Sequence, residues 1–164
     1  MAQLPYPDYN TPHAAATSHP TINILKLLSY STATAHHWTE LGHAQFKNLK
    51  LSNRDRELVI LLTSSKFNPV YEWAHRLPLS LKAGDENFED EKVGFSDKDL
   101  VLLTFVETII QQSEVGDQLW ERVRSEFSHR EIMEIISLQG FSYTFSRLNT
   151  VLQSDFDEWA KSKL

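Results

Sequence analysis

Apolar residues recur at helical spacing along most of this 164-residue chain. They return every three or four positions in 21–48, 53–67, 100–110, 117–127 and 129–138. No run of four or more residues alternates with period two between hairpin turns. The run at 100–110 is apolar on nearly every side, so we expect it at the centre of the fold or in a subunit interface. The pattern predicts an all-α fold of about seven helices.

Helix boundaries are marked by small polar residues and glycines. Ser52, Ser96 and Ser128 each precede an apolar run, where a serine hydroxyl can accept a hydrogen bond from the first helical turn. Gly116 and Gly140 are expected to separate consecutive helices. These signals place at least four helix starts in the second half of the chain.

The chain divides into a proline-rich arm and a helical domain. Residues 1–20 hold four of the six prolines, which favours extended backbone lying on the rest of the protein. Residues 21–164 are predicted to form the helical domain, folded around one core. Within it, the small polar stretch 31–35 predicts a break or a tight helix contact, and 68–84 predicts a helix bent by a proline.

Composition excludes several functional classes. Sixteen basic residues against 22 acidic ones give a net charge of −6, with no basic cluster, which disfavours nucleic acid and anionic membranes as partners. The chain has no cysteine, so disulfides, thiol chemistry and cysteine-bound zinc are excluded. A phosphate-binding glycine loop is missing, and we expect no cofactor. With neither a signal peptide nor an apolar run of membrane-spanning length, a cytoplasmic location is expected.

The densest cluster of chemically active side chains lies at 71–76. On a helix, Glu72 and His75 are neighbours, and Arg76 lies one turn from Glu72. A carboxylate beside an imidazole can hold its tautomer and favour its protonated form, which suits general acid/base catalysis. Tyr71 and Trp73 would lower the local dielectric constant. The alternative is an exposed salt bridge between Glu72 and Arg76, with His75 beside it.

Glu57 is a second candidate, because it begins the apolar run of its helix. A carboxylate at this position is expected to be partly removed from water, which is typical of groups that exchange protons in active sites. The alternative is that Glu57 lies in the first turns of the helix and pairs with Arg54 or Arg56.

Histidines and one arginine complete the candidates. His36, His37 and His43 lack the spacing of a metal site, so no metal is expected, and we expect one of them to face the core or a pocket. Arg147 lies in an aromatic segment and could bind a substrate carboxylate, cap a neighbouring helix or bridge subunits. Tyr143, in the same segment, could line a pocket or pack as an ordinary aromatic residue.

Three segments together carry a family resemblance. They are LSNRDRELVILLTSSKFNPVYEWAHRLPLSLKAG (51–84), HHWTELG (36–42) and GFSYTFSRLNT (140–150). With these segments the chain resembles the carboxymuconolactone decarboxylase-like group of the alkylhydroperoxidase D-like superfamily, from about residue 20 to about residue 155. The resemblance implies an all-helical fold that assembles into trimers or hexamers.

The same resemblance separates two kinds of activity. Peroxide-reducing members carry a C-x-x-C-x-x-x-H motif after a glutamate on the previous helix. Aligned on Glu57, the two cysteine positions are Pro69 and Glu72, and the histidine position is Arg76. The chain is therefore not expected to be a peroxidase. Decarboxylase-like members often carry glutamate at the second cysteine position, but His75 lies one residue early, a rotation of about 100° around the helix axis.

These observations predict a cofactor-independent decarboxylase or isomerase of a small organic acid or lactone, working by general acid/base catalysis. The alternatives are a cofactor-free dehydratase or cyclase of a specialised biosynthetic pathway, or a non-catalytic oligomeric binding protein. The predicted catalytic residues are Glu57, Glu72 and His75, and the predicted substrate-binding residues are His43, Tyr71, Trp73, Arg76, Tyr143 and Arg147.

Overall fold

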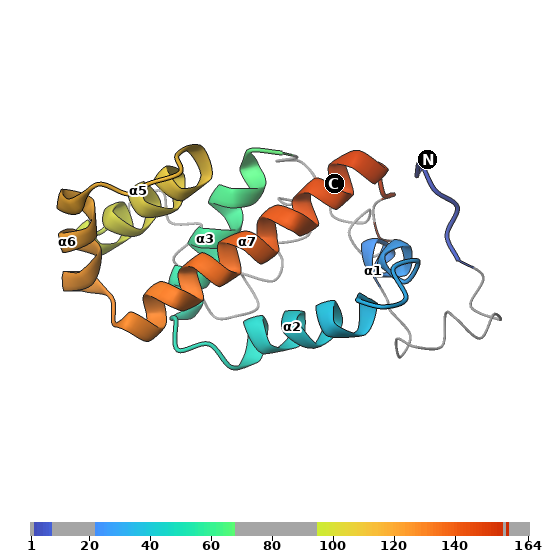
Figure 1. Cartoon of the computed structure of the whole chain (residues 1–164), viewed down its shortest axis with the longest axis horizontal. Helices are drawn as coiled ribbons and strands as arrows, with labels where there is room; N and C mark the ends of the chain where they lie inside the picture. Colours follow the sequence, from blue (N-terminus) through green and yellow to red (C-terminus); the bar gives the residue numbers. More distant parts are fainter. Residues whose placement is uncertain (1, 8–21, 68–94, 156, 158–164) are drawn as a thin grey trace. The chain divides into compact units, whose positions relative to one another are not determined.

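The computed structural model describes residues 2–7, 22–67, 95–155 and 157 (Figure 1). These residues contain helices and no strand, which confirms the all-α prediction. The helices are α1 (Asn23–Leu28), α2 (Ala35–Lys47), α3 (Asn53–Ser65), α5 (Asp97–Gln111), α6 (Asp117–Glu126) and α7 (His129–Leu152). The helix predicted over 68–84 lies outside the described residues.

The chain forms two compact units. The first unit comprises Met1–Asn48 and Thr144–Leu164, and the second unit comprises Leu49–Tyr143. The first contains α1 and α2, the second contains α3, α5 and α6, and α7 contributes to both. The large cluster of buried apolar residues belongs to the second unit.

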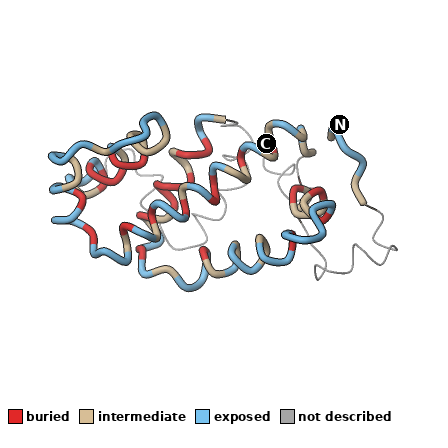
Figure 2. The backbone as a smooth tube through the Cα atoms, viewed as in Figure 1, coloured by how far each residue is buried: buried red, intermediate tan, exposed pale blue. Residues whose placement is uncertain are grey.

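Helix α5 forms the centre of the second unit's core. It contacts both α3 and α6, and its residues Leu102, Phe105 and Val106 are fully buried. The rings of Phe105 and Trp120 lie 5.3 Å apart, which joins α5 to α6. Buried and exposed residues alternate along α5 (Figure 2). On the side opposite the core, Leu100 is 46% exposed. The predicted central position of 100–110 is therefore confirmed for one face of the helix.

Serine residues begin three helices, as predicted. The Ser52 hydroxyl accepts a hydrogen bond from the backbone N–H of Asp55 at 3.0 Å. Ser96 and Asp99 form a reciprocal capping box at the start of α5. The backbone N–H of Ser128 donates to a carboxylate in the first turn of α7. Each hydroxyl satisfies an N–H that the helix itself leaves unpaired.

The predicted helix start at Gly140 is wrong. Helix α7 runs without interruption through this residue, for 24 residues. A glycine inside a helix costs only about 1 kcal/mol relative to alanine, which buried side chains on the same helix outweigh. Here Ile135, Leu138 and Phe141 keep one face of α7 buried on both sides of Gly140.

In the first unit, the break between α1 and α2 falls at residues 29–34, close to the predicted stretch 31–35. Ile24 and Leu27 are the buried apolar residues of α1. The backbone N–H of Asn23 donates to the Asp157 carboxylate at 2.7 Å, because α1 has no capping side chain of its own before it. The start of this helix is therefore capped from the other end of the chain.

Residues 2–7 of the N-terminal arm lie against the end of α7. The backbone N–H of Gln3 donates to the carbonyl of Leu152 at 2.8 Å. The Tyr6 hydroxyl donates to the Asp155 carboxylate at 3.2 Å and accepts from its backbone N–H at 2.9 Å. The remainder of the predicted arm lies outside the described residues.

Of the expectations about partners and location, the structure bears only on the membrane. Within the described ranges, none of the helices has both the length and the apolar character needed to cross a bilayer. The trimeric or hexameric assembly, the small-molecule substrate, the lack of a nucleic acid partner and the cytoplasmic location stay predictions.

Candidate functional site

Four of the nine predicted site residues lie in the described part of the chain. Glu57 and Tyr143 belong to the second unit, and His43 and Arg147 belong to the first. The other five lie outside the described residues: Tyr71, Glu72, Trp73, His75 and Arg76.

Glu57 is a buried carboxylate with a cation beside it. Its side chain is 4% exposed, and the Arg56 side chain is 14% exposed. Nε and Nη2 of Arg56 donate to Oε1 of Glu57 at 3.4 and 3.5 Å. A buried carboxylate is costly unless a charged or hydrogen-bonding partner compensates it, and Arg56 provides one. The interpretation that pairs Glu57 with Arg56 agrees with this geometry.

The position of Glu57 follows from the burial of its helix. Leu58, Val59 and Ile60 come directly after it and are 4%, 0% and 0% exposed. Four consecutive buried residues point in all directions around a helix, so this turn of α3 is enclosed on every side. Glu57 therefore places a carboxyl group, with an arginine beside it, in an environment poor in water.

A pair of ion pairs connects the first turns of α3 and α5. Arg54 donates to Asp99, with Nη2 3.2 Å from Oδ2, and Nζ of Lys98 lies 2.8 Å from Oδ2 of Asp55. Burial raises the pKa of Asp99, but hydrogen bonds from Arg54 and Ser96 outweigh it, so the pKa falls below its ordinary value. We call these four charged residues the ion-pair ladder.

Sequence reasoning missed the ion-pair ladder. It considered Arg54 only as a partner of Glu57, and it assigned no partner to Asp55. The available signal was the repeated order of charge, since Arg54-Asp55 and Lys98-Asp99 each place a cation before an anion near a helix start. Helix α3 is held against α5 by this ladder, which fixes the turn that carries Glu57.

The three histidines of α2 lie on the surface. His36, His37 and His43 are all exposed, so none of them faces the core, and the predicted contact of His43 with a substrate stays a prediction. His36 and His37 lie 3.3 and 3.8 Å from the Glu40 carboxylate, one helical turn away. The rings of His36 and His37 are therefore both exposed to water and close to a carboxylate. The described residues contain no group of three potential metal ligands.

Tyr143 and Arg147 are exposed residues of α7. Tyr143 is 41% exposed, and its ring meets the edge of Phe67 with the ring centres 4.8 Å apart. This contact places Tyr143 next to the C-terminal end of α3, the helix that carries Glu57. Arg147 is exposed in the first unit, and its proposed contact with a substrate stays a prediction.

Two buried hydroxyls were not among the predicted site residues. Thr63 is fully buried and Ser142 is 5% exposed, and neither Oγ1 of Thr63 nor Oγ of Ser142 has a hydrogen-bond partner in the described structure. An unpaired buried polar group costs about 1–3 kcal/mol, so each such group requires an explanation. In the sequence, Thr63 and Ser142 each lie at helical spacing from buried apolar residues, and this spacing could have predicted that their hydroxyls are buried.

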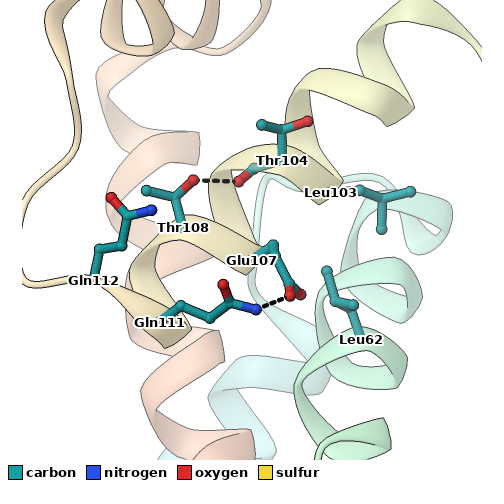
Figure 3. A pocket seen from close by; sticks show the side chains of 7 residues that line it. All are labelled: Leu62, Leu103, Thr104, Glu107, Thr108, Gln111 and Gln112. Atoms are coloured by element: carbon teal, nitrogen blue, oxygen red, sulfur yellow. Dashed lines mark hydrogen bonds between the residues drawn. The ribbon is translucent and has the colours of Figure 1, made fainter.

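A shallow pocket of about 410 Å³ lies on the second unit, between the C-terminal parts of α3 and α5 (Figure 3). Leu62 and Leu103 face each other across it, and Gln111 donates a hydrogen bond to Glu107. Glu107 is 34% exposed and pairs with Lys66 at 2.8 Å. Because its carboxylate is hydrated and already paired, this pocket suits acid/base chemistry less well than the surroundings of Glu57.

Comparisons with known proteins support the fold. No family model and no curated protein matches the sequence. Among solved structures, the chain is similar to an uncharacterized peroxidase-related protein from Silicibacter sp. TM1040, with a TM-score of 0.68 and 19% identity. The similarity covers 82% of this chain and 75% of that one. The described residues thus have a helical fold similar to that of a peroxidase-related protein, in agreement with the predicted alkylhydroperoxidase D-like fold.

Proposed function

We propose that the protein is a cofactor-independent enzyme that moves a proton on a small organic acid or lactone, giving decarboxylation or isomerisation. The observation that carries this proposal is the buried Glu57, paired with Arg56 inside an enclosed turn of α3. The absence of cysteine directs the proposal to carboxylate and imidazole chemistry, because a thiol-based peroxide reduction has no nucleophile here.

The proposed reaction needs few groups from the protein. In decarboxylation, the bond between carbon and the carboxylate breaks, and its electron pair moves into a conjugated carbonyl of the substrate. Carbon dioxide leaves, and an acid then donates a proton to the carbon that received the electron density. Isomerisation uses the same groups, with a proton removed from one carbon and returned to another.

Roles follow from position and residue type. Glu72 or His75 delivers the proton, and Glu57 is a positioning residue that orients and tunes the delivering group. Arg56 keeps the Glu57 carboxylate in place. An enclosed site strengthens these electrostatic interactions, since few water molecules compete with them.

The test is turnover of a panel of butenolide carboxylic acids and β-keto acids, followed by NMR in D₂O for loss of the carboxyl carbon and for deuterium incorporation. We expect Glu72→Gln or His75→Ala to lower kcat at least about 100-fold, as removal of a general acid does. Glu57→Gln is expected to lower kcat about 10-fold or more and to shift the pH–rate profile, because a positioning carboxylate affects the ionisation of its neighbour.

Glu107→Gln is the matched control, because it removes a carboxylate from the partly exposed pocket. Full turnover by Glu57→Gln with an unchanged pH–rate profile would contradict the role of Glu57. If the wild-type protein binds members of the panel and converts none, the binding-protein alternative replaces the enzyme. Native mass spectrometry tests the proposed trimer or hexamer in the same preparations.

A further inference from the structure

The buried face of α3 changes character along its length. Leu58, Val59 and Ile60 form part of the apolar cluster of the second unit. One turn later, Thr63 and Ser64 are equally buried, at 0% and 1% exposure. The part of α3 that follows the apolar cluster therefore places two hydroxyl groups in the interior.

Helix α7 shows the same change. Ile132, Ile135 and Leu138 belong to the apolar cluster, and Ser142 continues their spacing one turn further on. Ser142 is 5% exposed, so this hydroxyl also lies in the interior.

The two hydroxyl-bearing stretches lie close to each other. Phe67 and Tyr143 meet edge to face, with their ring centres 4.8 Å apart. Phe67 comes one helical turn after Thr63, and Tyr143 is the residue after Ser142. The ring contact therefore brings the end of α3 and this part of α7 together, with one unpaired buried hydroxyl on each.

We propose that Thr63 and Ser142 form a polar subsite that donates hydrogen bonds to an uncharged carbonyl oxygen of the substrate, as in a ketone or lactone. This inference rests on the proposed function and specifies the part of the substrate that binds. A hydroxyl is a good donor to a neutral oxygen, and a carbonyl has two lone pairs with which to accept from two donors. A ligand that fills the subsite would satisfy both hydroxyls at once.

The choice of an uncharged group follows from the charges nearby. A buried carboxylate needs a compensating cation, because two neutral hydroxyls alone leave its burial unfavourable. In the described residues, the basic side chains of α3 and of its C-cap already have carboxylate partners: Arg54 with Asp99, Arg56 with Glu57, and Lys66 with Glu107. A neutral carbonyl requires no countercharge, so it fits this position better.

The experiment measures binding of three probes by methyl NMR of threonine-labelled protein. The probes are δ-valerolactone, which has the carbonyl; tetrahydropyran, which has the same ring size without it; and glutarate, which is charged. We expect δ-valerolactone to shift the Thr63 methyl signal, which Thr63→Val identifies by removing it. Thr63→Val and Ser142→Ala are each expected to weaken δ-valerolactone binding at least 10-fold and to leave tetrahydropyran binding unchanged.

The matched controls are Thr39→Val and Ser125→Ala. In the wild-type protein, the Thr39 hydroxyl donates to the Ala35 carbonyl and the Ser125 hydroxyl donates to the Arg122 carbonyl. Neither is expected to alter lactone affinity. Without ligand, Thr63→Val is expected to unfold at the same temperature or higher, because valine removes an unpaired hydroxyl and keeps the volume. This measurement confirms that the variant folds.

Three results would overturn the inference: no binding of δ-valerolactone to the wild-type protein, equal affinity in the wild type and both subsite variants, or tighter binding of glutarate than of the lactone. A lower melting temperature of Thr63→Val with unchanged lactone affinity would assign the hydroxyl to an internal water instead. Glu57→Gln separates the two proposals: it should keep lactone affinity, whatever its turnover. Unchanged turnover with hydroxyl-dependent binding contradicts the catalytic proposal alone.

Discussion

The two units are stabilised in different ways. In the second unit, α3, α5, α6 and α7 share one cluster of buried apolar side chains, and Phe105 lies at its centre with no exposed surface. Among the described residues of the first unit, few apolar side chains are buried, and hydrogen bonds join segments far apart in the sequence. Tyr6 and Asp155, for example, are separated by 149 positions.

This difference predicts how strongly a substitution in each unit should lower the free energy of unfolding. Burial of apolar surface is shared among many neighbours, so loss of one large side chain leaves a cavity that the whole cluster experiences. A hydrogen bond between chain segments involves one donor and one acceptor, and its net contribution is about 1 kcal/mol. Substitutions in the second unit should therefore have larger effects than substitutions in the first.

The largest effect is expected for Phe105→Ala. Removal of this ring should lower the free energy of unfolding by about 4 kcal/mol, since large-to-small core substitutions cost 3–5 kcal/mol. Leu27→Ala, at a residue 2% exposed in the first unit, is expected to cost about 2 kcal/mol, at the low end for this substitution. Urea unfolding with amide exchange in each unit gives both values. Equal costs would contradict the contrast between the units.

Asp99→Asn should lower the free energy of unfolding by about 3 kcal/mol, because it removes the buried negative charge that attracts Arg54. Since the pKa of Asp99 is lowered from 3.8 in the folded protein, its contribution is present above that pH and is lost as the pH falls below it. Urea unfolding at pH 7, 5, 4 and 3 should show the variant and the wild type converging at low pH. Asp97→Asn, in the same turn but exposed, is the control.

Tyr6→Phe tests the first unit and should cost about 1 kcal/mol, the value of one hydrogen bond. Burial and the nearby Asp155 charge raise the pKa of Tyr6, so this contribution is present below pH 10.0 and is lost as the pH rises above it. Amide exchange at residues 3 and 155 is the measurement. Tyr143→Phe, at an exposed tyrosine of the second unit, should change stability by less than about 0.5 kcal/mol.

Gly140→Ala should stabilise the second unit by about 0.5–1 kcal/mol, because alanine is the better helix former and an added methyl group meets no atom within 4 Å. Gly116→Ala is the opposing control. Gly116 is the N-cap of α6, where alanine is unfavourable, so a loss of about 0.5 kcal/mol is expected. Melting temperatures of the two variants should therefore shift in opposite directions.

Local signals predicted much of the fold. Ser52 and Ser96 begin helices because each hydroxyl satisfies a backbone N–H only three residues away, a relation that is visible in the sequence. Gly140 misled the prediction, since its helix is maintained by packing from elsewhere in the chain. The contacts of Gln3 and Tyr6 with the end of α7 depend on distant residues, and no local pattern encodes them.

The candidate site was predictable in part for the same reason. The burial of Glu57 follows from its place at the start of an apolar run, and the structure agrees. The order of charges and the spacing of the hydroxyls are visible in the sequence. Their significance depends on which helices meet, and a single sequence does not contain that information. The roles of Glu72 and His75 stay predictions, because they lie outside the described residues.

The ion-pair ladder has a consequence for how the protein tolerates mutation. Each helix offers a cation followed by an anion, so a shift of one residue between α3 and α5 would bring charges of the same sign together. The ladder thus favours a single register between α3 and α5. Because Glu57 lies two residues beyond Asp55, selection for heat tolerance acting on these charges would also act on the placement of the carboxylate that positions the proton donor in the proposed reaction. Robustness and reactivity would then evolve as one trait.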